Sequence, residues 1–255
     1  MASQWRLLVQ WVMLFEGTTG LLLNVLLLLA NLDRRTRFQW LPYRICIVIA
    51  AVHGILDSMM TLSGLWIHVF VDDFFAVVWY GPAIYLPQWG RHALADVGTM
   101  LSFCIWQLIP APSILQYLTL CRKPMSDAKR LAISYSYCLL LILITGPFLN
   151  DYVPDPDSEF AREIKASGVR VQELHEDEDN FIVTGLSILP DPRNKNRSLA
   201  AMAVFGILPT YIMAYGVFLF TVVKIRTKLA SNNDLQLSQH TIEMQQKFMR
   251  MQILQ

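Results

Sequence analysis

Charged residues are scarce in this chain of 255 residues. They make up 16% of the sequence, against 54% for hydrophobic residues, whereas a soluble domain carries about 25% charge. The deficit lies in long apolar runs, while the segments between them are normally charged. This distribution excludes an ordinary soluble domain and indicates a protein that crosses a membrane several times. The formal net charge of +1 gives no reason to expect nucleic acid as a partner.

Cysteines and catalytic motifs are also few. The four cysteines lie in or at the ends of apolar runs, so the sequence shows no disulfide framework. It contains no nucleophile elbow, no phosphate-binding loop, no His-Glu-x-x-His and no paired-cysteine zinc spacing. We therefore expect no enzyme activity, no metal site and no cofactor. No internal repeat is visible, which weakens the interpretation as a transporter.

Five apolar runs have the length of a membrane-spanning helix, which needs roughly 20 residues. These runs cover approximately residues 7–30, 45–70, 93–120, 131–149 and 199–223. In hydrocarbon the backbone must satisfy its own hydrogen bonds, so we predict an all-α membrane protein with a single transmembrane domain over 1–255. The first run is too long for a signal-peptide core and is expected to remain as an anchor. A sixth helix is expected to begin at 247–255, where the chain ends.

The loop charges predict an orientation. The segments 31–44, 121–130 and 224–255 carry 13 of the 21 basic residues. Because basic loops stay on the cytoplasmic side, we predict that these segments, including the loop 224–246, are cytoplasmic and that the N-terminus is outside. Arg193, Lys195 and Arg197 disagree, since they precede the fifth run on the opposite side.

Two segments are then expected outside the membrane. The first, about 71–92, is rich in aromatic residues that include Trp79, Tyr80 and Trp89. Either an interfacial aromatic belt or a lid that faces a ligand explains this composition. The second is the loop 150–198, in which Asn196 begins an acceptor triplet for glycosylation close to the fifth run.

Polar residues inside the runs are functional candidates by default, because burying them in lipid is costly. Asp57 lies near the middle of the second run and is either a structural carboxylate bonded to a neighbouring helix, such as that of Asn24, or a switch. Asn24 itself is expected to join helices. Pro110 and Pro112 are expected to bend the third run, since each removes a backbone donor. Asp96 is expected near its outer end, facing either solvent or a ligand.

Several short motifs follow one another along the chain. They are Gly20 to Asn24, Pro42-Tyr43-Arg44 followed by Asp57, Tyr80-Gly81-Pro82, Leu208 to Ile212, Lys224 to Leu229, and Leu237 to Thr241 with the segments 246–248 and 253–255. In this order they resemble the motifs of nematode serpentine chemoreceptors, the delta class of the Str-type group, a family of seven-helix G-protein-coupled receptors. The resemblance covers most of the chain and is strongest in the last 50 or so residues.

The resemblance implies a rhodopsin-like bundle of five transmembrane helices plus the start of a sixth, truncated before its last two helices. The chain would detect a small odorant or peptide and couple to a heterotrimeric G-protein in the plasma membrane of sensory neurons, at the cilium. Ligand contacts would come from Trp79, Tyr80, Trp89 and Asp96. The moving parts would be Asn24, Asp57, Pro110 and Pro112. The G-protein would meet Arg122, Lys123, Lys224 and Arg226.

Two positions depart from the family pattern. Gln116 stands before Tyr117 where an arginine is usual, and Gly90 and Arg91 occupy the place of an expected cysteine. Two other interpretations stay open. In the first, the chain is a truncated receptor fragment that does not signal. In the second, which has less support, it is a subunit of a small transporter or channel.

Overall fold

The computed structural model contains five helical spans that are long and apolar enough to cross a membrane. The structure describes residues 2–32, 41–71, 73–122, 124–149, 182–190 and 198–230, together with 159, 162, 163, 166 and 192. Within these parts the spans cover Leu7–Leu32, Leu41–Gly64, Trp89–Cys121, Asp127–Pro147 and Leu199–Leu229. The predicted helical membrane fold with five spans is therefore confirmed. The predicted sixth helix and most of the loop 150–198 lie outside the described residues.

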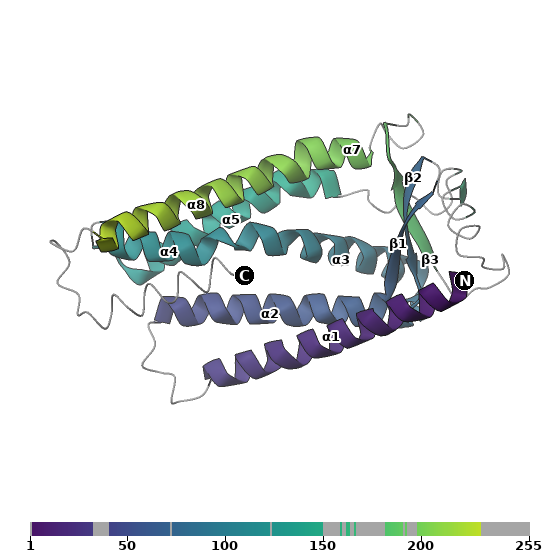
Figure 1. Cartoon of the computed structure of the whole chain (residues 1–255), viewed down its shortest axis with the longest axis horizontal. Helices are drawn as coiled ribbons and strands as arrows, with labels where there is room; N and C mark the ends of the chain where they lie inside the picture. Colours follow the sequence, from purple (N-terminus) through teal and green to yellow (C-terminus); the bar gives the residue numbers. More distant parts are fainter. Residues whose placement is uncertain are drawn as a thin grey trace.

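The spans run side by side, and a small sheet stands across one end of the bundle (Figure 1). We call this the sheet end and the opposite end, where α4 and α8 finish, the basic end. The described basic side chains gathered there are Arg44, Arg122, Lys129, Arg130, Lys224, Arg226 and Lys228. The helical elements are α1 (Ala2–Leu32), α2 (Leu41–Gly64), α3 (Gln88–Leu108), α4 (Pro110–Cys121), α5 (Asp127–Leu149), α7 (Leu199–Ala201), the π-helix η4 (Met202–Ile207) and α8 (Leu208–Ala230).

Small residues bring α1 and α2 together. A Cβ atom on Gly20 would lie 2.7 Å from the Ser58 hydroxyl oxygen, and one on Gly54 would lie 2.6 Å from the Asn24 amide. Within a bilayer, where apolar burial drives little association, such close approach of two backbones is a main source of helix packing. On its other side α1 exposes large apolar side chains such as Phe15, which is 74% exposed, as a lipid-facing helix should.

The second helix ends earlier than predicted, at Gly64 rather than residue 70. Leu65 has a positive φ of 45°, and the Tyr80 and Gly81 amides both donate to the Gly64 carbonyl. The chain reverses here, so residues 66–71 become a strand. Gly81 is required at this turn, because a Cβ atom there would lie 2.2 Å from the Ser63 carbonyl oxygen. The aromatic and β-branched character of the run suits a strand as well as a helix, which is why hydropathy alone misplaced the boundary.

The sheet joins the two segments that we predicted to be outside the membrane. Its antiparallel order is β1 (Trp66–Val71), β2 (Phe74–Trp79) and β3 (Ile182–Ser187). Trp66 pairs with Trp79, and Phe75 pairs with Leu186. One face packs on the bundle through a buried cluster of Val77, Trp79, Ala83, Ala95, Leu186 and Met202. The sheet therefore closes one end of the bundle with an apolar core of its own.

The third and fifth spans are longer and less regular than predicted. The third starts at Gln88, five residues before the predicted start, and is divided at Ile109 into α3 and α4. The fifth passes through the π-helix η4 before α8 and continues to Ala230, seven residues beyond the predicted end. The segment 224–230, which we predicted as loop, is helical because Ile225 and Leu229 are buried against α4 and extend the apolar face by another turn.

Candidate functional site

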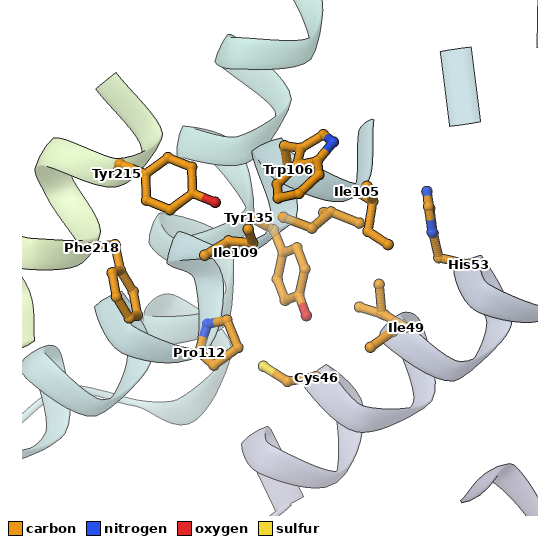
Figure 2. Close-up of a pocket in the computed structure, with 12 residues that line it drawn as sticks. Cys46, Ile49, His53, Ile105, Trp106, Ile109, Pro112, Tyr135, Tyr215 and Phe218 are labelled. Carbon is orange, nitrogen blue, oxygen red and sulfur yellow. The ribbon is translucent and has the colours of Figure 1, made fainter. Parts of the chain in front are cut away.

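A cavity of about 450 Å³ lies in the middle of the bundle. Figure 2 shows the α2 side chains on one side of it and the α8 side chains on the other, with residues of α3, α4 and α5 between them. Its volume is in the range of small-molecule sites, roughly 300–1,000 Å³. The lining residues are Cys46, Ile49, Ala50, His53, Ile105, Trp106, Leu108, Ile109, Pro112, Tyr135, Tyr215 and Phe218. None of them carries a permanent charge, so the cavity suits a neutral and mostly apolar molecule.

His53 supplies the most defined polar group in this cavity. Its Nε2 atom lies 3.0 Å from the Leu101 carbonyl oxygen, and the side chain is 9% exposed. A carbonyl oxygen only accepts hydrogen bonds, so in the neutral imidazole Nε2 carries the proton and Nδ1 is left as an acceptor. No described residue donates to Nδ1. His53 therefore offers one acceptor to a molecule in the cavity.

Tyr135 lies beside the α2 side chains. Its hydroxyl group points toward Cys46 and Ile49 (Figure 2) and is within hydrogen-bonding reach of the Cys46 sulfur. Across the cavity, the Trp106 and Tyr211 rings lie 5.3 Å apart, and Tyr211 stacks on Tyr215 at 5.8 Å. The walls are thus aromatic rings with polar tips, which give shape to the cavity and a few directional contacts.

The break between α3 and α4 lies in the wall of this cavity. Pro110 and Pro112 have no N–H, so the carbonyls of Trp106 and Leu108 lose their helical donors. Ile109 keeps helical angles (φ −51°, ψ −43°), so the helix is interrupted in its hydrogen bonding rather than ended. Ser113 donates to the Pro110 carbonyl at 2.9 Å. The predicted role of both prolines in movement stays a prediction, but Pro112 now has a defined place in the cavity wall.

Two sets of buried contacts between side chains tie α8 to the other helices. Near the basic end, Thr221 donates to Ser113 of α4 at 3.0 Å. At the level of the cavity, where α3 ends, Gln107 donates to Thr145 of α5 at 2.5 Å, and Thr145 donates to Thr210 of α8 at 3.2 Å. Thr210 in turn donates to the Ile207 carbonyl at 2.9 Å, at the end of the π-helix. In this direction each hydroxyl uses its single proton once.

Asp57 and Asn24, the intramembrane candidates of the first two spans, are not bonded to each other. Ser102 of α3 donates to the Asp57 carboxylate at 3.5 Å, a long contact. The Asn24 amide donates to the Gly20 carbonyl of its own helix at 2.8 Å and packs on Gly54. Asp57 therefore faces α3, and Asn24 contributes to helix packing through its shape.

The four residues predicted to contact a ligand lie outside the cavity. Trp79 is 4% exposed and its ring lies 5.3 Å from Trp66, so it belongs to the core under the sheet. Trp89 is 76% exposed, and Tyr80 and Asp96 are half-buried. On the sheet itself, His68 stacks on Phe75 at 5.4 Å, and loss of hydration there lowers the pKa of His68.

The basic end carries the residues predicted to face a G-protein. Arg122, Lys224 and Arg226 are exposed at the ends of α4 and α8. Lys123 lies outside the described residues, and so does the glycosylation candidate Asn196. Beneath these cations, Ile225 and Leu229 pack against α4 residues that include Tyr117. The two helices therefore end as one packed unit.

Sequence reasoning missed most of the cavity wall. Trp106, Tyr135 and Tyr215 read as ordinary apolar residues of their spans, and only their polar tips distinguish them from leucine or phenylalanine. His53 stands one helical turn before Asp57 in the sequence, but its contact with α3 depends on how the two helices pack. All four cysteines are free thiols. Among the residues that the structure describes, no three histidine, cysteine or acidic side chains are grouped to hold a metal ion.

Comparison with known proteins places these features in a family. No curated protein matches the chain, and no solved structure does. One family model matches it over residues 1–255, that of the serpentine type 7TM GPCR chemoreceptor Srj. The predicted likeness to serpentine chemoreceptors is thereby confirmed, while the assignment to the delta class stays a prediction. The chain belongs to the Srj family of serpentine seven-transmembrane chemoreceptors.

Proposed function

We propose that this protein is a chemosensory receptor that binds a small, mostly apolar molecule in the central cavity and couples to a heterotrimeric G-protein. The observation that carries the proposal is an uncharged cavity of about 450 Å³ between the spans of a chain from a chemoreceptor family. This volume favours a small odorant over a peptide. His53 favours a ligand that can donate one hydrogen bond, because its Nδ1 is an acceptor.

The coupling step follows from which helices share the cavity. A ligand in the cavity would touch Pro112 of α4 and Phe218 of α8. Nearer the basic end, the same two helices are joined by the Thr221–Ser113 hydrogen bond and by the buried Ile225. A ligand that prefers one arrangement of these helices shifts the population toward it. The ends of α4 and α8, with Arg122, Lys123, Lys224 and Arg226, would then present a changed surface to the G-protein.

The location follows from the same reasoning. The charge pattern supports an N-terminus outside and the basic end in the cytoplasm. A receptor for external chemicals would act in the plasma membrane of sensory neurons, at the cilium. Trp89 and Asp96, near the sheet end, would meet a ligand on its way in rather than hold it.

The test is a cavity-filling substitution in cells with a G-protein activation reporter, challenged with a panel of short-chain alcohols, ketones and esters. Ile49→Phe fills the cavity from α2, and Val52→Phe places the same aromatic ring at an exposed position of that helix. We expect the first to abolish responses and the second to preserve them. His53→Leu should reduce responses to alcohols more than to ketones. Equal responses of both phenylalanine variants would refute the cavity as the ligand site. A chain that reaches the surface but answers no compound would favour the non-signalling fragment.

A further inference from the structure

Two cations at the basic end are held over aromatic rings from two different helices. The guanidinium carbon of Arg122 lies 5.5 Å from the centre of the Tyr117 ring, on α4. The Lys224 ammonium lies 5.7 Å from the centre of the Phe220 ring, on α8. The two rings meet edge to face at 6.1 Å. The four side chains therefore form one group, which we call the seam cluster, across the contact between α4 and α8.

Positive charge is concentrated around this cluster. Arg122, Lys224 and Lys228 all lie near enough to the Cys121 sulfur to act on it electrostatically, and that sulfur is 3.9 Å from the Lys224 carbonyl oxygen. Among the described residues of the basic end, the single acid against seven basic residues is Asp127. Its carboxylate is taken by Arg130, at 2.9 Å. The seam cluster thus has a strong local excess of positive charge.

The cluster also borders the lipid-facing surface. Phe220 is 52% exposed, and its neighbours Leu219 and Val223 are 58% and 59% exposed. Apolar side chains thus lead along α8 to the cations at its end. An anionic lipid has matching chemistry, with acyl chains beside the apolar face and a charged headgroup at the level of the cations. An acidic protein surface would match the charges but not this apolar face.

We propose that the seam cluster binds the headgroup of a phospholipid that carries phosphate monoesters. The guanidinium of Arg122 offers paired donors to phosphate oxygens, and the Lys224 ammonium adds a point charge. The rings of Tyr117 and Phe220 hold both cations in place before the lipid arrives, which lowers the entropy cost of binding. Several converging cations suit a multiply charged headgroup better than the single net charge of phosphatidylserine.

The seam cluster can be tested separately from another cation of α8, Arg226. At 3.6 residues per turn, Arg226 lies about 200° around α8 from Lys224. It therefore leaves the helix on the opposite flank, although it is also basic, exposed and near the end of α8. Arg226 is a matched control for Lys224. Arg122, Lys224 and Arg226 all belong to the surface proposed for the G-protein, so lipid binding, and not coupling, is the measurement that separates the seam cluster from this control.

The experiment measures lipid binding to the full chain in phosphatidylcholine vesicles that contain a labelled bisphosphorylated inositol lipid, by energy transfer from a fluorophore on the protein. Phosphatidylserine at matched total charge is the comparison. We expect the wild type to prefer the inositol lipid, and the double variant Arg122→Gln with Lys224→Gln to lose about tenfold or more in affinity. Arg226→Gln should stay within about twofold, since it removes one distant charge. Phe220→Leu, which keeps every charge, should lose several-fold because Lys224 is no longer held.

Four results would overturn the proposal. Equal losses in the Arg226 and seam variants would mean diffuse attraction to a charged surface. Equal binding of phosphatidylserine would remove the preference for phosphate monoesters. Competition by the soluble inositol phosphate at the same concentration would indicate a site for free phosphate. Unchanged lipid binding in the double variant, with loss of G-protein coupling, would assign the cluster to an acidic protein surface.

Discussion

Replacing Thr145 by valine should destabilise the bundle more than replacing Gln107 by methionine, although both remove the same hydrogen bond. Thr145 is 1% exposed and Gln107 is 3% exposed. The Gln107 Oε1 atom is buried without a partner, while its Nε2 donates to Thr145. Reversing the amide would change which atom lacks a partner but not the number. The two substitutions therefore leave different groups behind.

The loss of stability expected from each substitution depends on which buried polar groups keep a hydrogen-bond partner. Thr145→Val keeps the side-chain shape but strands the whole Gln107 amide, and a buried group without a partner costs about 1–3 kcal/mol. Gln107→Met removes that amide together with its unpaired oxygen, and the Thr145 hydroxyl can still donate its one proton, either to Thr210 at 3.2 Å or to the Leu141 carbonyl at 3.0 Å. Interhelical hydrogen bonds in membranes are worth about 0.6 kcal/mol on average, so this substitution should cost about 0.5 kcal/mol or less.

The assay is a double-mutant cycle on the purified protein, with unfolding in mixed micelles followed by circular dichroism. The coupling energy between positions 107 and 145 should be about 0.6–1.7 kcal/mol. Thr119→Val is the control, because within the described part of the chain the Thr119 hydroxyl bonds only the Leu115 carbonyl of its own helix, at 2.8 Å. A coupling energy of zero, or a larger loss for Gln107→Met than for Thr145→Val, would refute the polar connection between α3, α5 and α8.

Two further substitutions test the turn at the sheet end and the intramembrane acid. Gly81→Ala should lower surface expression and cost about 1–3 kcal/mol, because its Cβ atom would meet the Ser63 carbonyl oxygen at 2.2 Å. Gly216→Ala, with open space around it, should be neutral, and equal expression of the two would argue against this packing. Asp57→Asn keeps the contact with Ser102 but removes a titratable charge, and should change the ligand response without changing surface expression. If a calcium-reporter dose curve is unaltered, Asp57 is not a switch.

The number of spans was predictable because the hydropathy of each apolar run depends only on its own residues. A stretch of about 20 apolar residues crosses the membrane whatever its neighbours are. The sheet was not predictable, because residues 66–71 have the hydropathy of a span and their pairing partners, 74–79 and 182–187, lie in other segments. The same limit applied to Trp79, whose ring suggested ligand contact and lies in the sheet core.

The candidate site was also predictable only in part from the sequence. Pro110 and Pro112 predicted an interruption of the third span, since the missing N–H is a property of the residue itself. That Pro112 would share a cavity with His53 and Tyr135 depended on how three helices pack. The orphaned oxygen of Gln107 depended in the same way on the helices that surround it.

The sequence by itself determined that this is a membrane protein, with the five spans found in the part of the chain that the structure describes, and its motifs identified the chemoreceptor family. Hydropathy and the order of motifs are properties of the sequence alone and do not depend on contacts between distant residues. The tertiary structure decided where the second span stops, which side chains enclose the cavity and how Arg122 and Lys224 come together at the ends of α4 and α8. These are contacts between residues far apart in the chain, set by side-chain shape and by the carbonyls that turns and prolines leave open.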